Sequence, residues 1–238
     1  MTNVSDREIL KALDILASVD ESYRLEQICK INNAQEIEYK RLLDEFDRLH
    51  KISSKSPGTP SNLHNLKGNA LEDLVNYLFI ISGGIFEVDR NLHTSTNEID
   101  DLITLTPKGK TLLSRNLINN RLDTFLGECK NYNKSVSVTY IGKFCSLLLT
   151  NNVKLGILFS YHGISGSGWE FGAGLVKKFY LHKESLSERF CIIDFSIKEF
   201  KSILTGRNLL EIIEEQLRSL QFDTNYSQYL SKHPAEEL

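Results

Sequence analysis

Several residue types are scarce in this chain of 238 residues, and each shortage argues against a class of protein. The four cysteines lie far apart and none forms a Cys-x-x-Cys pair, which argues against a zinc knuckle and a disulfide scaffold. The longest apolar runs, residues 74–81 and 145–149, are too short to cross a bilayer. The first eight residues are polar and charged and lack the apolar core of a signal peptide. We therefore expect a soluble cytoplasmic protein with no membrane partner.

An excess of basic residues is also missing. Lys and Arg number 28 against 31 Asp and Glu, which gives a net charge of −3. Proteins that bind nucleic acid are usually basic, so the overall charge counts mildly against such a partner. A basic groove can nevertheless lie on an acidic protein. The hydrophobic content of 41% and charged content of 25% are those of a globular protein with a packed core.

Residues 1–60 show the periodicity of three short helices. The third helix is expected over residues 35–49, with Ile37, Leu42, Phe46 and Leu49 on one apolar stripe. Three helices with tight connections resemble a winged-helix module, and residues 53–61, with two of the four prolines, form a linker or a wing. The third helix is rich in acidic residues, which suit phosphates poorly. DNA binding and protein interaction or dimerisation both remain open for this module.

Residues 61–220 alternate between helical and strand-like patterns. This order indicates an α/β fold with a mixed central sheet that helices cover on both faces. Residues 221–238 form a polar tail. Helices are expected at residues 68–81, 107–116, 138–150, 169–179 and 198–220, and strands at residues 85–89, 98–105, 124–128, 155–161 and 190–195.

Acidic and basic residues recur at the strands of this region. In the segment TFLGECKNYNK, strand alternation places Glu128 and Lys130 side by side on one face. Asp100 lies on strand 98–105, where a neighbouring strand could bring it beside Glu128, and Glu72 lies on the preceding helix. Asp101 and Glu98 are rivals for the position of Asp100.

This combination of side chains suits metal-assisted cleavage of phosphodiesters. Mg²⁺ is typically held by one or two carboxylates together with water and substrate phosphate. A bound metal lowers the pKa of its water and stabilises the charge that develops at phosphorus. A neighbouring lysine can orient the attacking water, or deprotonate it if the lysine pKa is depressed.

The order of helix Glu72, strand Asp100 and strand Glu128-Cys129-Lys130 resembles the PD-(D/E)XK nuclease superfamily, and its Mrr-like restriction endonuclease branch, over residues 66–220. The resemblance implies a restriction-endonuclease-like core. It implies that Asp100, Glu128 and the backbone carbonyl of Cys129 bind the metal, that Lys130 is catalytic and that Glu72 belongs to the outer metal shell. The long interval between Asp100 and Glu128, with an extra helix at 107–116, departs from the pattern.

The function implied is a Mg²⁺-dependent deoxyribonuclease, with Mn²⁺ as a substitute, acting on DNA in restriction, anti-phage defence or DNA repair. Cutting both strands would call for a homodimer. Lys134 and Lys143 are candidate phosphate contacts, and His162, Trp169 and Phe171 are weaker candidates that packing can also explain. The alternatives are a non-cleaving nucleic-acid-binding or sensor protein on the same fold, and a winged-helix regulator.

Overall fold

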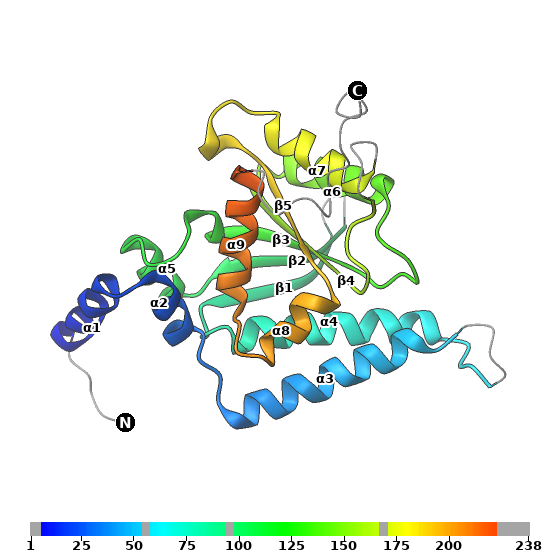
Figure 1. The fold of residues 1–238 in the computed structure, drawn as a ribbon, viewed down its shortest axis with the longest axis horizontal. Coiled ribbons are helices and arrows are strands. Elements are labelled where there is room, and N and C mark those ends of the chain that lie inside the picture. Colours follow the sequence, from blue (N-terminus) through cyan, green and yellow to red (C-terminus); the bar gives the residue numbers. More distant parts are fainter. Residues whose placement is uncertain (1–5, 54–57, 94–97, 167–170, 223–238) are drawn as a thin grey trace, which may run out of the picture.

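The computed structural model describes residues 6–53, 58–93, 98–166 and 171–222. Within these residues a five-stranded sheet has the order β1-β2-β3-β4-β5 (Figure 1). The strands β1, β2 and β3 form an antiparallel meander, and β4 and β5 continue the sheet parallel to β3. This mixed sheet flanked by helices confirms the α/β class. The strands are β1 (Phe86–His93), β2 (Glu98–Leu105), β3 (Thr124–Lys130), β4 (Leu155–Ser160) and β5 (Cys191–Phe195).

The long interval between β2 and β3 does not separate the two strands in space. They pair directly, with Asp101 opposite Gly127 and Thr104 opposite Thr124. The intervening residues form α5 (Pro107–Ser114) and a short 3-10 helix, Asn120–Leu122. Helix α5 begins where the sequence predicts, with Pro107 in its first turn and the Thr106 hydroxyl accepting the Gly109 N–H. The extra helix is therefore an insertion at one end of the sheet.

The two faces of β3 meet different helices. Helix α4 (Leu63–Ile81) covers one face, where the ring of Phe79 lies 5.9 Å from Phe125 of β3 and 5.9 Å from Phe159 of β4. Helix α6 (Val138–Thr150) covers the other, where a Cβ on Gly156 would lie 2.6 Å from the Phe144 ring. Gly156 pairs with Leu126. Leu126, Glu128 and Lys130 consequently share the α6 face.

The amino-terminal helices join the same core as the sheet. Helix α3 (Asn33–Lys51) runs alongside α4 (Figure 1), and the Tyr39 hydroxyl donates a buried hydrogen bond of 3.0 Å to the Phe200 carbonyl. Phe200 belongs to α8 (Ile197–Ile203). Helix α2 (Glu21–Ile28) also contributes buried leucine and isoleucine side chains, whereas α1 (Asp6–Ser18) projects outward (Figure 1).

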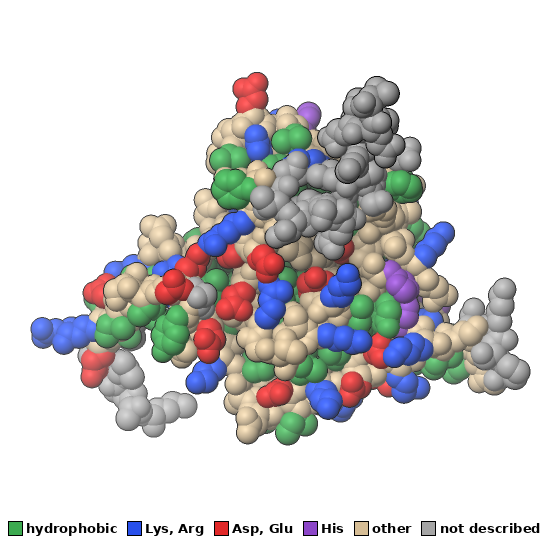
Figure 2. Space-filling model, in the orientation of Figure 1, with side chains coloured by type: hydrophobic (Ala, Val, Ile, Leu, Met, Phe, Trp, Pro, Cys, Tyr) green, Lys and Arg blue, Asp and Glu red, His purple; other side chains and the backbone are tan. Residues whose placement is uncertain are grey.

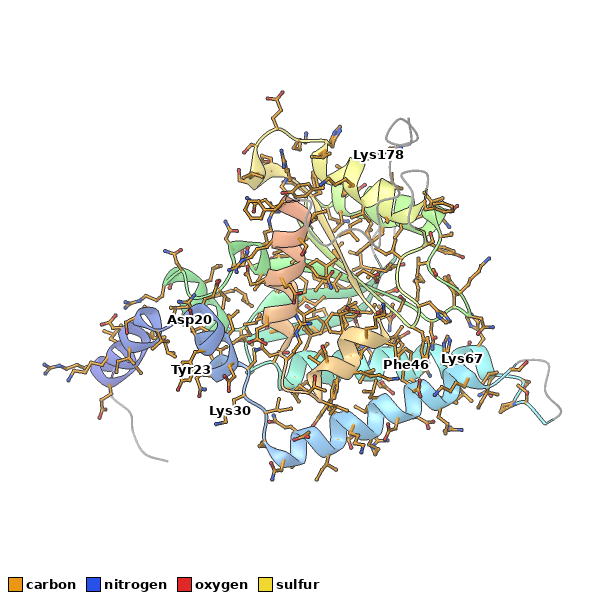
Figure 3. All side chains as sticks on the ribbon, viewed as in Figure 1. Asp20, Tyr23, Lys30, Phe46, Lys67 and Lys178 are labelled. Atoms are coloured by element: carbon orange, nitrogen blue, oxygen red, sulfur yellow. The ribbon has the colours of Figure 1, made fainter. Side chains whose placement is uncertain are left out.

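This arrangement differs from the separate winged-helix-like module expected over residues 1–60. The apolar stripe of α3 is covered by α4 and α8, so the described residues share one continuous core. Ile37, expected on that stripe, is 71% exposed, and the buried stripe is Tyr39, Leu43, Phe46 and Leu49. Phe46, labelled in Figure 3, points from α3 toward the interior, and Tyr39 is likewise fully buried.

Three further expectations concern the remaining chain. Helix α7 (Gly172–Leu181) overlaps the helix expected at 169–179 but ends two residues later. The single long helix expected over 198–220 is wrong, because α8 ends at Ile203 and a separate helix α9 (Leu209–Phe222) follows it. Trp169, part of the 53–61 linker and most of the 221–238 tail fall outside the described residues. No helix among the described residues combines the length and apolarity needed to cross a membrane.

Candidate active site

Asp100, Glu128 and Lys130 converge at the boundary between β2 and β3. The Lys130 Nζ lies 2.7 Å from Glu128 Oε1 and 2.9 Å from Asp100 Oδ2. The same Asp100 oxygen accepts the backbone N–H of Cys129 at 3.0 Å. Since Asp101 pairs with Gly127 in antiparallel register, Asp100 falls opposite Glu128. The structure thus brings together these three predicted residues, which we call the acid–lysine cluster.

The cluster lies near the surface but is largely shielded. The side chains of Lys130, Glu128 and Asp100 are 20%, 18% and 24% exposed. Burial alone would lower the pKa of Lys130, but the carboxylates of Glu128 and Asp100 outweigh it and hold that pKa above its ordinary value. The Lys130 ammonium is therefore protonated at neutral pH. It is suited to orient water or to stabilise negative charge, and it lacks the depressed pKa that a general base needs.

Asp101, the rival to Asp100, faces the opposite side of the sheet. It is 3% exposed, and the Cys129 thiol donates to its Oδ2 at 3.6 Å. Burial raises the pKa of Asp101 to about 6. Strand alternation therefore separates two consecutive aspartates into different environments, and Asp100 is the one that contacts Lys130. The side chain of Glu98 lies outside the described residues.

Glu72 does not join the acid–lysine cluster. It lies on α4, which covers the other face of the sheet, and its Oε2 accepts Arg90 Nη2 at 2.7 Å. Arg90 of β1 lies opposite Asp101 of β2 in the strand register, and its Nη1 is 3.7 Å from Asp73 Oδ1. Glu72, which is predicted to belong to an outer metal shell, thus forms a salt bridge with Arg90 instead. No local sequence pattern predicts this ion pair, because the strand arginine and the helix acids are brought together only by the packing of α4.

The donor atoms of the cluster fit a hard divalent cation in chemical type. Asp100 and Glu128 supply two converging carboxylates, as Mg²⁺ or Mn²⁺ sites commonly use together with water and phosphate. Across the described chain, no group of three or more His, Cys, Asp and Glu side chains is arranged to hold a metal. A cation here would therefore depend on the two carboxylates and on oxygens from the backbone, water or substrate.

A second polar group adjoins Lys130 on the α4 side. The Asn131 Nδ2 donates to the Lys67 carbonyl at 2.8 Å, which turns its Oδ1 toward His50 Nδ1 at 2.7 Å. His50 Nε2 lies 3.1 Å from His162 Nε2, and burial lowers the pKa of His50. The His50 ring also stacks on Tyr161 at 3.5 Å between centroids.

These contacts fix the turn that follows β3. Sequence reasoning singled out His162 but did not predict the contact between His50 and Asn131, because His50 lies in the last turn of α3, 81 residues from Asn131. Figure 3 shows Lys67 near the same end of the molecule as the carboxyl-terminal part of α3.

The two predicted phosphate contacts lie on exposed surface beyond the cluster. Lys143 is exposed on α6, with its Nζ 5.5 Å from the centroid of the Tyr140 ring. Lys134 is exposed and lines an open cleft of about 450 Å³ together with Tyr132 and Tyr140. Acidic and basic side chains are interspersed on the face that Figure 2 presents, so any preference for phosphate must be local.

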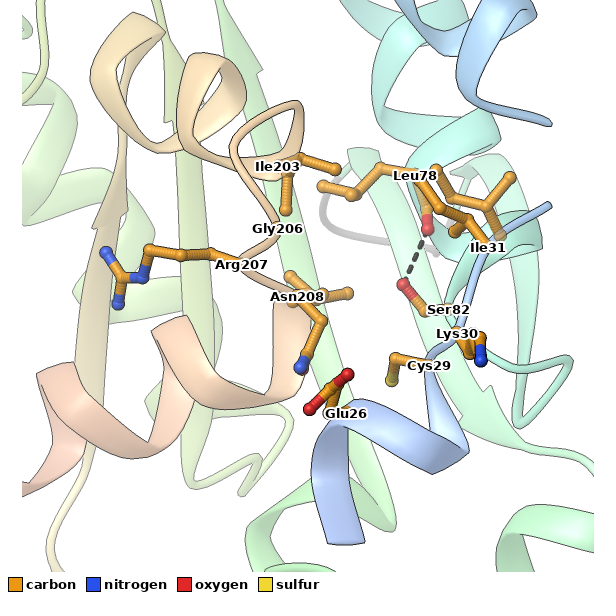
Figure 4. A pocket seen from close by; sticks show the side chains of 12 residues that line it. Glu26, Cys29, Lys30, Ile31, Leu78, Ser82, Ile203, Gly206, Arg207 and Asn208 are labelled. Atoms are coloured by element: carbon orange, nitrogen blue, oxygen red, sulfur yellow. Dashed lines mark hydrogen bonds between the residues drawn. The ribbon is translucent and has the colours of Figure 1, made fainter. Parts of the chain in front are cut away.

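Another cavity lies between α2, α4 and the connection from α8 to α9 (Figure 4). Its volume is about 150 Å³, and Leu78, Ile31 and Ile203 form apolar walls. Burial raises the pKa of its Cys29 thiol to about 12, which keeps the thiol protonated and unreactive. Its described lining residues contain no acid–lysine arrangement like that at Lys130.

No protein-family model, curated protein or solved structure matches this chain. The functional argument therefore depends on the geometry of the site.

Proposed function

We propose that this protein is a metal-dependent nuclease that hydrolyses phosphodiester bonds in DNA. One observation carries the proposal: Asp100 and Glu128, from neighbouring strands, direct their carboxylates at the same lysine nitrogen within 3 Å. Two adjacent carboxylates repel each other, and Lys130 neutralises only one of the two charges. Such a partly shielded acidic pair is suited to receive a divalent cation.

The residues of the cluster have distinct roles in this proposal. Asp100 and Glu128 hold Mg²⁺, or Mn²⁺ in its place, with the Cys129 carbonyl as a further ligand. The metal supplies a Lewis acid for the scissile phosphate and an activated water. Lys130 remains close to both carboxylates and stabilises negative charge at phosphorus. Glu72, held by Arg90, contributes to the fold around the site.

The arrangement of elements supports a restriction-endonuclease-like core as the finer description of the fold. Helix α4 precedes the β1–β2–β3 meander, the acids lie on β2 and β3, and α6 leads to the parallel strand β4. This order agrees with the resemblance of the sequence to PD-(D/E)XK nucleases. We propose a homodimer acting in the cytoplasm in restriction, anti-phage defence or DNA repair.

Cleavage of supercoiled plasmid in Mg²⁺ tests the proposal. Asp100→Asn, Glu128→Gln and Lys130→Met each remove one charge with little change in shape. We expect each to reduce the rate at least about a hundredfold, the scale of losing one electrostatic group in a preorganised site. Glu87→Gln, an exposed acid on β1, is the matched control and should cleave like the wild type. Chelation of the metal should abolish cleavage.

Two results would contradict parts of this proposal. Wild-type rates in all three cluster variants would reject the site. If the wild type cleaves no DNA and shows no Mg²⁺ or Mn²⁺ binding that depends on Asp100 and Glu128, the nuclease is rejected, and a non-cleaving binding protein or regulator is favoured.

A further inference from the structure

The chain that follows β3 carries aromatic and basic side chains on the surface beyond the acid–lysine cluster. Tyr132 follows Lys130 by two residues, and its ring centroid lies 5.0 Å from that of Tyr140 with the planes inclined by 41°. Tyr140 and Lys143 lie on the first two turns of α6. We call Tyr132, Tyr140, Lys134 and Lys143 the tyrosine–lysine strip.

The strip belongs to the same face of the sheet as the cluster. Tyr140 belongs to α6, which covers the face of the sheet that carries Glu128 and Lys130, and Tyr132 contacts the Tyr140 ring. Burial, together with hydrogen bonding to Tyr140, raises the pKa of Tyr132 to about 12, and the charges of Lys130 and Glu128 also act on it. Tyr132 is therefore within electrostatic reach of the cluster.

The ring of Tyr140 is only partly covered, by the Tyr132 ring and by Lys143, whose Nζ lies over it at 5.5 Å from the centroid. It is 36% exposed, whereas Phe144 and Leu148 of the same helix are 2% and 0% exposed against the sheet. Tyr132 contacts the ring of Tyr140 from inside and limits its orientation. An aromatic ring that is held in place and open to solvent offers a stacking surface.

The surface around Tyr132 lacks carboxylates among its described residues, although the chain as a whole has a net negative charge. Tyr132 lines two open clefts, of about 390 and about 450 Å³, and no carboxylate is among the described residues that line either of them. Lys67 lines the first cleft and Lys134 the second. Lys67 is 6% exposed and its Nζ donates to the His50 carbonyl at 2.8 Å, so it adds positive charge beneath the first cleft, whereas the exposed Lys134 can contact a polyanion that crosses Tyr132.

We propose that the tyrosine–lysine strip binds unpaired nucleotides, so that the acid–lysine cluster acts on single-stranded DNA or on frayed ends. The cleavage part of this inference rests on the proposed nuclease function. The binding of unpaired nucleotides does not depend on it. A base can stack on a tyrosine only if its own face is free, whereas bases inside a duplex already stack on their neighbours. The lysines supply phosphate contacts that are independent of sequence.

Fluorescence anisotropy in EDTA measures this binding without cleavage. The probes are a labelled 20-nucleotide single strand of mixed sequence and the same sequence as a blunt duplex. We expect the single strand to bind more tightly. Tyr140→Ala should weaken single-strand binding at least about fivefold, the lower end of the loss per stacked base on alanine substitution. Tyr140→Phe keeps the ring and should bind like the wild type.

Further variants separate stacking from misfolding and from charge. Tyr23→Ala removes an exposed tyrosine on α2, far from Lys67 in Figure 3, and should leave binding unchanged. Tyr140→Ala changes an exposed ring, so its circular dichroism should match that of the wild type. Lys134→Gln should reduce the slope of log K against log salt by about 0.7 if it removes one single-strand phosphate contact.

The outcomes distinguish this inference from the proposed function. Equal affinity for the two probes, or unchanged single-strand binding in Tyr140→Ala, overturns the inference even if the protein cleaves plasmid. Single-strand binding that requires the Tyr140 ring, in a protein that does not cleave with Mg²⁺, supports the inference and rejects the nuclease.

Discussion

At the scale of single residues, the site depends on the alternation of side chains along β2 and β3. Asp100 and Asp101 are consecutive, yet one contacts Lys130 and the other is buried beside the Cys129 thiol on the opposite face. The first remains partly exposed and paired with a cation, whereas the second is buried, and its hydrogen bond from Cys129 and the charge of Arg90 offset only part of the cost of burial. Their chemistry therefore differs although their spacing from Glu128 in the sequence is almost the same.

The raised pKa of Asp101 leads to a prediction about stability and pH. The fold disfavours the ionised carboxylate, so Asp101 destabilises the protein above pH 6, and this cost disappears as the pH falls from about 6 toward the ordinary value of 3.8. Asp101→Asn should increase the free energy of unfolding at pH 8 by up to about 3 kcal/mol, at about 1.4 kcal/mol per pKa unit. An unpartnered amide nitrogen would reduce this gain.

Urea unfolding of both proteins between pH 4 and pH 8 measures the difference. The gain should shrink steadily on acidification below pH 6. A gain that stays constant across the range would show that ionisation of Asp101 is not its cause.

At the scale of elements, helix α3 shows how packing selects one face of a helix. Both Ile37 and Phe46 fit a helical stripe in the sequence, but Phe46 is fully buried against Tyr161 and Phe200, and Ile37 is 71% exposed. The capping box formed by Asn32 and Gln35 fixes the start of the helix, and its contacts with α4 and α8 fix its rotation.

Two substitutions on α3 test this rotation. Phe46→Ala should lower the free energy of unfolding by about 3–5 kcal/mol, because it removes a buried aromatic ring and leaves a cavity. Ile37→Ala on the same helix should change it by less than about 0.5 kcal/mol, as surface substitutions usually do. Denaturant unfolding gives both values, and similar losses for the two variants would mean that α3 is docked differently.

At the scale of the whole molecule, the sheet and helices α2 and α3 share one continuous core. The Tyr39 hydroxyl of α3 bonds to the Phe200 carbonyl, and His50 at the end of α3 reaches Asn131 directly after the acid–lysine cluster. The amino-terminal helices therefore support the turn that leads out of the site. This gives them a structural role whether or not they also bind a partner.

A shared core predicts cooperative unfolding. Amide hydrogens of α3 should exchange with the same free energy of opening as those of β3 and β4, because none of these elements can be released without exposing the others. Hydrogen exchange measured by mass spectrometry at increasing urea compares them. Loss of protection in α3 at lower urea than in β3 would indicate an independent amino-terminal unit.

The sequence by itself determined those features that depend on local patterns. Periodicity predicted the α/β class and the strands around Asp100 and Glu128, and alternation predicted that Glu128 and Lys130 share a face. The start of α5 at Pro107 followed from ordinary capping chemistry. Each of these is set within a few residues along the chain, where steric and hydrogen-bonding preferences are sufficient.

Only the tertiary structure decided which distant residues meet. In the folded chain, β2 pairs with β3 across an inserted helix, and Glu72 forms a salt bridge with Arg90. Tyr39 and Phe46 of α3 are buried, and the Tyr140 ring contacts that of Tyr132. These contacts depend on how buried surfaces fit together, and many alternative pairings satisfy the same local patterns. The acid–lysine cluster thus has its side-chain directions from the sequence and its convergence from the packing of the sheet.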